Sequence, residues 1–450
     1  MSEILSTIAN YAWGTPLIIW LFIANFYLLY VSKLIPLKGF SHAFSILRKR
    51  KSDSDLLNNE HGSLSPFQAL CNALSATIGL GNIGGVAVAI YHGGAGAVFW
   101  MWVTAFLGMN TKFFEVALSV IYRGKNHHGE VVGGPMYVIE NQFPKQFQFL
   151  GWFFALCGII GTLSLFQINQ LTEFAHDNIG VNKNYFGIGA ALVIGVILFG
   201  GIKRITKVTS KLVPIMSLSY LTLTLLILLM NLGKLPELFL SIFQQAFNPT
   251  AAAGGVGGYV LMKVIQTGVK RATFSNEAGL GTEPMAHSDV QTKEPISEGY
   301  VSILGPFFDT IIICSLTALV ILLYFDPSQN NLNGVLLATN AYRQALGQFG
   351  VVAIGIIITL FSFSTMIGMA NYNKKCWDFI FRGRFFMGDK AFLLYYLFTI
   401  WFGATNSLDD VVNLIDSAYA FMAIPNVIVL LVLAGRVKEK LTVYNNTYLK

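Results

Sequence analysis

The stretch Pro66-FQALCNALSATIGLGNIGGVAVAIYH-Gly93 is apolar and long enough to cross a bilayer, but its midpoint reads Gly79-Leu80-Gly81-Asn82. Each glycine inside a helix costs up to about 1 kcal/mol relative to alanine. Asn82 adds a polar side chain at the same depth, where polar groups are costly and usually functional. We therefore expect the helix to unwind at 79–82, where free N–H groups attract a carboxylate and free carbonyls hold a cation. For Gly84 and Gly85, close helix packing is the alternative.

The whole chain has the composition of a protein whose solvent is lipid. Of its 450 residues, 54% are hydrophobic and only 12% are charged, whereas soluble domains average about 25% charged residues. No polar segment is long enough to build a separate soluble domain. The formal net charge of +7 comes from basic residues in short loops, which is typical of membrane orientation and not of nucleic-acid binding. The predicted fold class is an all-α, multi-pass protein of the cell membrane.

Eleven transmembrane helices are predicted from the apolar stretches. Their approximate limits are 15–35, 66–92, 95–121, 149–170, 186–202, 211–231, 256–283, 298–324, 348–371, 385–404 and 411–434. Two short helices are expected in loops, near 235–247 and 333–346.

The basic residues predict how these spans are oriented. With the N-terminus outside and the C-terminus in the cytoplasm, the inner segments hold 25 of the 30 Lys and Arg residues. The outer loops then hold only Lys183, Lys234 and Arg343. A miscounted span would reverse this bias halfway along the chain, and the bias does not reverse.

The first span stands apart, and the other ten divide as five plus five. An odd number of spans in each half inverts the topology of the second half, which is a transporter architecture. The predicted divisions are an extra N-terminal helix with its inner loop, two inverted repeats and an inner tail. They cover residues 1–65, 66–231, 232–434 and 435–450.

The seventh span opens the second repeat and should contain the counterpart of the first break. Its midpoint falls at Gln266-Thr267-Gly268, and a second glycine pair, Gly279 and Gly281, lies nearer its inner end. The sequence leaves both stretches open as the place of unwinding.

Charged residues also occur within the predicted spans. Lys270, Arg271 and Glu277 form either an inner-side charge network or a cytoplasmic gate whose ion pairs break on opening. Lys112 and Glu115 are three residues apart in the third span, so they can pair on one helix face.

Hydroxyl and amide side chains lie in two further spans. Ser362, Ser364 and Thr365 are in the ninth span, which is expected beside the first break. Their hydroxyls either bond back to their own helix or, at Ser364-Thr365, form an oxygen site for a hard cation such as sodium. Gln167 and Asn169 in the fourth span either face a substrate or tie helices together. The cysteines and histidines have no metal-ligand or disulfide spacing, and no catalytic motif occurs, so neither an enzyme nor an organic cofactor is expected.

Five strings of sequence resemble the alanine or glycine:cation symporter family, and the resemblance covers essentially the whole chain. They are Ser65-PFQALCNALSATIGLGNIGGVAVAI-Tyr91, Gly96-AVFWMWVTAFLGMNTKFFEV, Gly133-GPMYVIE, Phe274-SNEAGLGTEPMAH and Met422-AIPN. The resemblance implies a leucine-transporter-like fold with one extra N-terminal helix. It also implies symport of a small amino acid, alanine or glycine, with sodium or in some members a proton.

The resemblance and the two candidate breaks together predict the residues of the site. The expected substrate-binding residues are Asn72, Thr77, Gly79, Leu80, Gly81, Asn82, Gln167, Ile265, Gln266, Thr267, Gly268 and Met369. The expected sodium ligands are the carbonyls of Ser75 and Ile78 and the hydroxyls of Ser364 and Thr365.

The chain departs from the usual pattern of this family at three of these positions or beside them. Leu80 stands where many members have threonine, Gln266 where arginine is common, and Met369 where an aromatic residue is usual. A flexible methionine can widen a pocket. The predicted function is sodium-coupled uptake of a small neutral amino acid by alternating access, with no obligate protein partner. A proton-coupled or uncoupled carrier or channel for a different small amino acid is the alternative.

Overall fold

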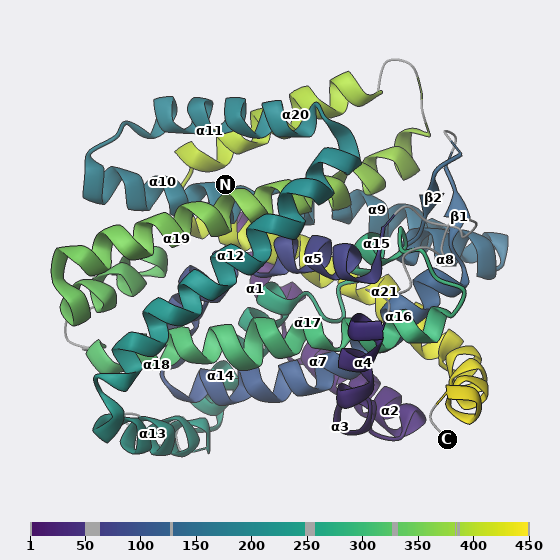
Figure 1. Ribbon diagram of the computed structural model, residues 1–450, viewed down its shortest axis with the longest axis horizontal. Helices are drawn as coiled ribbons and strands as arrows, with labels where there is room; N and C mark the ends of the chain where they lie inside the picture. The colour runs from purple at the N-terminus through teal and green to yellow at the C-terminus, as the bar shows by residue number, and fades with distance from the viewer. Residues whose placement is uncertain are drawn as a thin grey trace.

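The computed structural model describes residues 2–49, 64–126, 129–247, 257–325, 332–382, 384 and 388–448. The predicted inner-loop residues Arg50 and Lys51, Val256 at the start of the seventh span, the first residues of the tenth span at 385–387 and the tail residue Lys450 lie outside that part. The described residues form a helical bundle with one two-stranded antiparallel hairpin (Figure 1).

The helices before residue 122 include the predicted first, second and third spans. They are α1 (Ser2–Ala12), α2 (Thr15–Ser32), α3 (Ile35–Lys38), α4 (Phe40–Lys49), α5 (Pro66–Thr77), the π-helical turn η2 (Gly81–Gly85), α6 (Val86–Gly93) and α7 (Gly96–Ile121).

The hairpin and the helices up to residue 247 follow. They are β1 (Gly124–Lys125), β2 (Val131–Val132), α8 (Pro135–Gln142), η3 (Lys145–Phe147), α9 (Phe149–Gly161), α10 (Leu165–Ile179), α11 (Lys183–Leu198), α12 (Gly201–Leu229), η4 (Leu232–Lys234) and α13 (Leu235–Phe247).

The described part of the chain beyond residue 256 is again helical. Its elements are α14 (Gly257–Asn276), α15 (Pro284–His287), α16 (Pro295–Ser302), α17 (Leu304–Pro306), the π-helical η5 (Phe307–Cys314), α18 (Ser315–Tyr324), α19 (Gly334–Phe381), α20 (Asp389–Thr405) and α21 (Leu408–Tyr448).

All eleven predicted spans fall on helices in the part of the chain that the structure describes. By length and composition alone, six segments can cross a membrane: Ser2–Ser32, Lys145–Ile179, Arg204–Leu229, Pro295–Tyr324, Gly334–Phe381 and Leu408–Tyr448. Helices α5 and α6 with η2 form a bent pair, with an angle of 51° at the break, that would make a seventh. The other four predicted spans, α7, α11, α14 and α20, do not pass this test of length and composition. Helices α11 and α20 are short, with 16 and 17 residues, and α7 and α14 carry charged residues. The count of eleven and the inverted repeat stay predictions.

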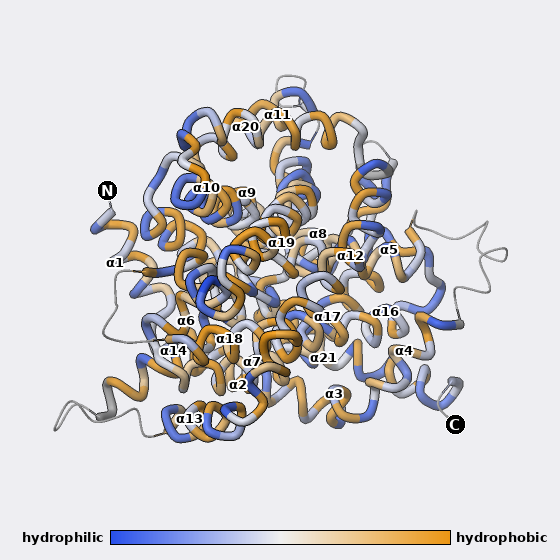
Figure 2. The backbone as a smooth tube through the Cα atoms, turned by 60° about the vertical axis from the view of Figure 1, so that its left-hand side comes forward, coloured by the Kyte–Doolittle hydropathy of each residue, from blue (hydrophilic) through white to orange (hydrophobic). Residues whose placement is uncertain are grey.

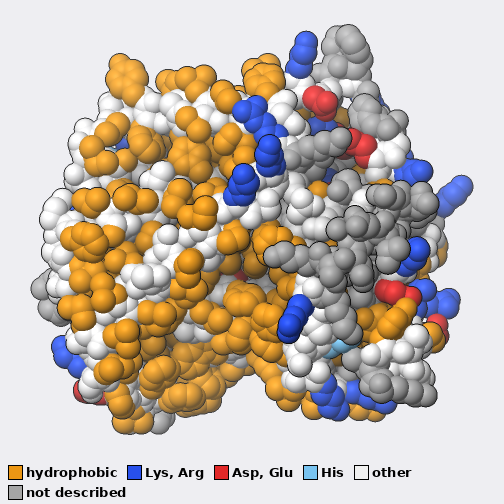
Figure 3. Space-filling view, in the orientation of Figure 1, with side chains coloured by type: hydrophobic (Ala, Val, Ile, Leu, Met, Phe, Trp, Pro, Cys, Tyr) orange, Lys and Arg blue, Asp and Glu red, His pale blue; other side chains and the backbone are white. Residues whose placement is uncertain are grey.

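The outward faces of the long helices are apolar. Leu192 and Val196 on α11, Leu218 on α12 and Ile356 on α19 are all more than half exposed, which suits a lipid solvent. Figure 3 shows hydrophobic side chains over the left and centre of the molecule, while many of the visible Lys and Arg side chains gather at the right. In Figure 1, α8 and the C-terminus lie on that same side. On this face, the apolar part and many of the basic side chains therefore lie on different sides, an asymmetry that is typical of membrane proteins.

The centre of the bundle is built around α5, which packs against α12 and α19. Its start is fixed by a capping box, in which Ser65 accepts from the N–H of Gln68 and the Gln68 side chain accepts from the N–H of Ser65, with Pro66 in the first turn. Helix α14 packs along α7, and α21 packs against α9 and α1. Figure 2 shows hydrophobic and hydrophilic segments mixed along these central helices, so polar side chains are enclosed within the bundle.

One further break agrees with the predicted short helix near 333–346. Helix α19 is interrupted at Gly347, whose φ of 62° is in the left-handed region that favours glycine. The segment before Gly347 is therefore a separate helix that precedes the long ninth span.

Candidate functional site

The first break lies where the glycines predict it. Helix α5 ends at Thr77, and Ile78 has extended backbone angles of φ −74° and ψ 98°. The N–H of Gly79 leaves the helical pattern and donates to Oδ1 of Asn82 at 2.7 Å. The chain then resumes as η2, and π-helical turns are frequent at functional sites. The predicted break is present, but it covers Ile78, Gly79 and Leu80, whereas Gly81 and Asn82 of the predicted stretch 79–82 already belong to η2.

Helix α19 contacts this break directly. The hydroxyl of Thr365 lies 3.4 Å from the carbonyl oxygen of Ile78. A Cβ atom added to Gly79 would overlap Oγ1 of Thr365. Only glycine at position 79 therefore lets the broken helix approach α19 this closely. One turn further along α19, Gly368 packs against Ser75 in the same way, with Oγ of Ser75 2.5 Å from where a Cβ would lie. The expected meeting of the first break with the ninth span is therefore present.

Two of the expected site residues are buried and have no hydrogen-bond partner among the residues that the structure describes. Neither the amide nitrogen nor the amide oxygen of Asn72 has one, although Asn72 is completely buried. Oγ of Ser364 is likewise buried and unpaired. Ser75 and Thr77, in contrast, donate to their own helix, to the carbonyls of Asn72 and Ala73. An unsatisfied buried polar group costs about 1–3 kcal/mol, so these two side chains are suited to a polar ligand.

The second break follows α14, at the glycine pair and not at the midpoint of the span. Glu277, Gly279 and Gly281 have φ values of 57°, 88° and 77°. The carboxylate of Glu115 on α7 accepts from the N–H groups of Gly279 at 3.0 Å and Gly281 at 3.1 Å. It also accepts from the side chain of Asn426 at 2.6 Å. A carboxylate thus satisfies the backbone groups that the break releases.

The predicted substrate role of the midpoint of the seventh span is not supported by its position. Helix α14 is continuous through residues 265–268. Gln266 donates to the Thr15 hydroxyl on α2 at 3.3 Å, and Gly268 packs on Ala97 and Trp100 of α7. Thr267 packs on Gly93. The contacts of Gln266, Thr267 and Gly268 are therefore contacts between helices, and Ile265 is partly buried on the same helix.

Gln167, Asn169 and Met369 lie in the core around the break but differ in their roles. Asn169 donates to the carbonyls of Gly403 and Asn406, so it ties α10 to the end of α20. The carbonyl of Gln167 accepts from Ser362 at 3.4 Å, which joins α10 to α19. Met369 is buried on α19, one residue after Gly368.

An aromatic cluster covers the break and was not part of the predicted site. The ring of Phe274, at the end of α14, lies 3.5 Å from the position of a Cβ on Gly81. The ring centroids of Phe166 and Tyr419 are 5.0 and 5.7 Å from that of Phe274. The guanidinium of Arg271 lies 4.9 Å from the same centroid. Aromatic side chains from α10, α14 and α21 therefore pack together next to Gly81.

The charges of the seventh span do not form one network. Lys270 pairs with Asp416 on α21 at 2.7 Å, and Arg271 pairs with the same carboxylate oxygen. Glu277 accepts from Thr282 at 2.5 Å instead. The prediction of a single gate is wrong because Lys270 and Arg271 point to α21, whereas Glu277 follows the end of the helix. Asp416 is missing from the predicted site, although a lone acidic residue inside an apolar span signals a functional position.

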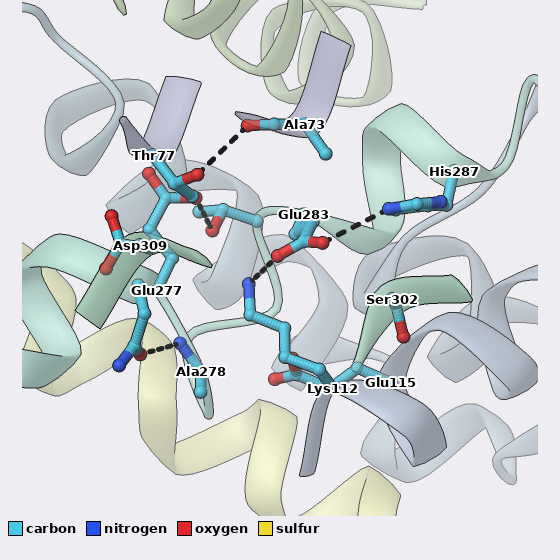
Figure 4. Close-up of polar contacts among 12 residues, drawn as sticks. Ala73, Thr77, Lys112, Glu115, Glu277, Ala278, Glu283, His287, Ser302 and Asp309 are labelled. Atoms are coloured by element: carbon cyan, nitrogen blue, oxygen red, sulfur yellow. Dashed lines mark hydrogen bonds and ion pairs between the residues drawn. The ribbon is translucent and has the colours of Figure 1, made fainter. Parts of the chain in front are cut away.

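A second buried charge cluster surrounds the second break. Lys112 pairs with Glu283 and not with Glu115, so the predicted pair within α7 is wrong. Figure 4 shows Glu283 between Lys112 and His287. The two ring nitrogens of His287 lie 3.1 Å from Glu283 and 2.7 Å from Glu298. Burial lowers the pKa of His287, but the bonds to the two carboxylates outweigh it and raise that pKa to about 9.

The fold and the break define a class of protein. A helical membrane protein whose central helix is broken in its apolar part, beside oxygen groups from another helix, has the architecture of a secondary transporter. The solved structure of MhsT in complex with L-phenylalanine shares this fold, with a TM-score of 0.58, 16% identity, and coverage of 83% of this chain and 90% of that chain.

A family model described as the sodium:alanine symporter family matches residues 1–450. The chain belongs to that family. It is 36% identical to the sodium/alanine symporter AgcS of Methanococcus maripaludis over 98% of this chain and 97% of the relative. It is 31% identical to the probable sodium/glutamine symporter GlnT of Bacillus subtilis over 96% of this chain and 89% of the relative. The protein is therefore a multi-pass membrane transporter and not an enzyme.

Proposed function

We propose that this protein carries a small neutral amino acid, alanine or glycine, into the cell together with sodium. The observation that carries the proposal is the meeting of Thr365 with the carbonyl of Ile78 at the break after α5. A hydroxyl and a carbonyl freed from helical bonding are ligands that sodium takes. The unwound backbone that follows this carbonyl suits the amino-acid carboxylate through its N–H groups, although the N–H of Gly79 itself donates to Oδ1 of Asn82.

The sodium site that fits best contains Ser75, Ile78, Ser364 and Thr365. The unpaired, fully buried hydroxyl of Ser364 supports it, because a buried hydroxyl without a partner is satisfied by a bound ion. The contact between Ser75 and Gly368 keeps α5 and α19 close together next to this site. An ion held by both helices links the broken segment to the ninth span.

The amino-acid site proposed here runs from Thr77 through Gly79, Leu80 and Gly81 to Asn82, with Asn72 beside it. The close approach of Phe274 to Gly81 favours a substrate with a small side chain. Leu80 is completely buried, so it adds an apolar surface where a hydroxyl is common in the family. The relatives named above include both an alanine and a glutamine symporter, so substrate size is decided by residues such as Phe274 and Met369 and not by the family alone.

We assign the outer closure of this site to Phe274, its aromatic neighbours and the pairing of Arg271 with Asp416, in place of the expected inner-side network or cytoplasmic gate of Lys270 and Arg271. Asp416 lies nine residues into α21, which begins at Leu408, and the predicted orientation puts the start of that helix outside. In this proposal the pair and the aromatic cluster separate when the site opens outward, and the second break with Lys112 lies towards the cytoplasm. The five-plus-five division at 66–231 and 232–434 supplies the two moving halves.

Uptake in proteoliposomes tests the proposal. Radiolabelled alanine or glycine should accumulate only when an inward sodium gradient is imposed, and external sodium should set the rate. Accumulation driven by a proton gradient without sodium would favour the proton-coupled alternative. Flux that equilibrates the amino acid without either gradient would show an uncoupled carrier or channel, and would contradict the proposal.

A further inference from the structure

We propose that the exposed face of α12 binds an anionic phospholipid of the inner leaflet, with the headgroup phosphate held by Arg204, Lys207 and Lys211. This lipid site is separate from the break after α5, and it goes beyond the proposed transport function. The predicted orientation, with the N-terminus outside, puts the start of α12 on the cytoplasmic side of the membrane.

The three basic residues lie on one face of α12. Arg204, Lys207 and Lys211 are spaced three and four residues apart, and all three are exposed. Residues at these spacings are neighbours on a helix surface, with their Cβ atoms about 5–6 Å apart. Two adjacent basic side chains can therefore reach one phosphate group. The sequence adds a fourth basic residue, Lys203, in the same turn, and a group of this size next to a membrane span is typical of anionic-lipid binding.

The positive charge at the start of α12 is not balanced by acidic residues. No Asp or Glu occurs in the sequence from residue 178 to residue 236. Among the residues that the structure describes, the three basic side chains of α12 take part in no ion pair. By contrast, Lys375 on α19 pairs with Asp289 at 2.7 Å. The uncompensated charge attracts the anionic headgroups of the cytoplasmic leaflet.

The same face of α12 becomes apolar beyond Lys211. Ile215, Leu218 and Leu229 continue the stripe at helical spacing, and each is more than half exposed. Figure 3 shows a short row of Lys and Arg side chains bordering the hydrophobic surface that α12 crosses in Figure 1. A basic stretch followed by an apolar one matches a phospholipid, because its headgroup is charged and its acyl chains are apolar. A free phosphate ion would use only the basic part.

The opposite face of α12 is occupied by protein. Helix α12 packs against α5 and α19, and the ring centroid of Tyr220 lies 5.4 Å from that of Phe361 on α19. The Tyr220 hydroxyl also contacts the Thr317 hydroxyl on α18. The stripe from Arg204 to Leu229 is therefore the side of α12 that is left for the membrane. A lipid bound along it fixes the depth of α12 in the bilayer.

Native mass spectrometry of the full chain tests this site. The purified protein, in a neutral detergent, is titrated with equal amounts of phosphatidylglycerol and phosphatidylcholine that have the same acyl chains, so only the headgroup charge differs. We expect the wild type to retain phosphatidylglycerol preferentially. The Lys207→Gln/Lys211→Gln variant should bind this lipid about thirtyfold more weakly, or about fivefold for each charge removed.

Two further variants show whether position and charge both matter. Lys207→Arg/Lys211→Arg keeps the charges and should bind phosphatidylglycerol as the wild type does. Lys438→Gln/Lys440→Gln removes the same charge from the exposed end of α21, on the same predicted side of the membrane, and should also bind as the wild type. Phosphatidylglycerol should raise the melting temperature of the wild type and of both these variants, but not that of Lys207→Gln/Lys211→Gln.

Other outcomes would overturn the site. Equal phosphatidylglycerol binding by the wild type and Lys207→Gln/Lys211→Gln, or an equal loss in the α21 control, would show that α12 has no specific lipid site. Displacement of the lipid by inorganic phosphate, at an ionic strength matched with sodium chloride, would assign the basic residues to a free anion. A wild-type dimer without bound lipid, absent in Lys207→Gln/Lys211→Gln, would show that a second copy covers this face. Each readout is lipid binding, so none of these results bears on sodium-coupled uptake.

Discussion

The hydroxyl group of Thr365, on the ninth predicted span, lies 3.4 Å from the carbonyl oxygen of Ile78 at the break of the second span. The carbonyl is free because the helix ends one residue earlier, and the approach is possible because the next residue is Gly79. Local sequence and tertiary packing thus combine at a single contact.

The Gly79→Ala variant should lose most uptake. Its new methyl group would overlap the Thr365 hydroxyl, and overpacking of this kind costs about 1–3 kcal/mol, so we expect a loss of rate of about five- to 150-fold. The measurement is sodium-driven alanine uptake at equal protein amounts. Gly189→Ala is the control, because that exposed helical glycine has no atom within 4 Å of an added Cβ. Full activity of Gly79→Ala would show that the close approach is dispensable.

The Thr365→Ala variant should need more sodium for the same rate. Loss of one hydroxyl ligand of about 1.5 kcal/mol corresponds to roughly a tenfold rise in the half-saturating sodium concentration. Thr365→Ser should restore most of the affinity. Thr359→Ala on the same helix is the control, since the Thr359 hydroxyl bonds to the Gly355 carbonyl of its own helix. An unchanged sodium dependence in Thr365→Ala would remove this residue from the site.

The Asp416→Asn variant should be strongly destabilised. It leaves the charges of Lys270 and Arg271 without their carboxylate, and breaking a buried pair costs about 3–5 kcal/mol. Thermal unfolding in detergent measures this loss. The Lys183→Gln variant breaks a partly exposed pair with Glu173 and should cost at most about 1 kcal/mol.

The same Asp416→Asn variant also tests the assigned gate. A cysteine placed near Phe274 should react faster with an external thiol reagent when the Asp416 pairs are absent. Identical labelling rates with and without Asp416 would rule out a gating role and leave a structural one.

The stability of the protein should fall as pH rises through the range in which His287 loses its proton. Its pKa is about 9 in the folded protein, above the ordinary value of 6.5. The protonated ring between Glu283 and Glu298 therefore stabilises the fold fully below about pH 6.5, and this contribution disappears as pH rises to about 9. Melting temperature against pH is the measurement. His287→Gln should flatten the curve between these values, while His176→Gln, at an exposed histidine, should leave it unchanged.

Much of the fold could be read from the apolar pattern. Long apolar stretches must be helical in lipid, because backbone groups have no other partner there, and all eleven predicted stretches fall on helices among the described residues. The first break was also predictable, since Gly79 and Gly81 weaken the helix locally and Asn82 supplies a substitute acceptor. Asp309 and Asp416 could have been found by the same rule, as acidic residues within the apolar parts of predicted spans.

The position of the second break could not be predicted from the sequence. Residues 266–268 and the pair Gly279 and Gly281 both contain glycine, so local propensity favours neither. The position of the second break is decided by Glu115, which lies on a helix more than 160 residues earlier in the chain. Its carboxylate accepts hydrogen bonds from the N–H groups of Gly279 and Gly281.

The sequence by itself determined the membrane location, the helical class, the position of the first break and the family, because each depends on composition or on residues that are neighbours along the chain. Only the tertiary structure decided which charges pair, with Lys112 bound to Glu283 and Arg271 to Asp416. It also decided that Phe274 covers the break at Gly79–Asn82 and that Asp309 faces it. The physical reason is that a charge or a ring interacts over a few ångströms of space, and the packing of the helices determines which distant residues come within that range.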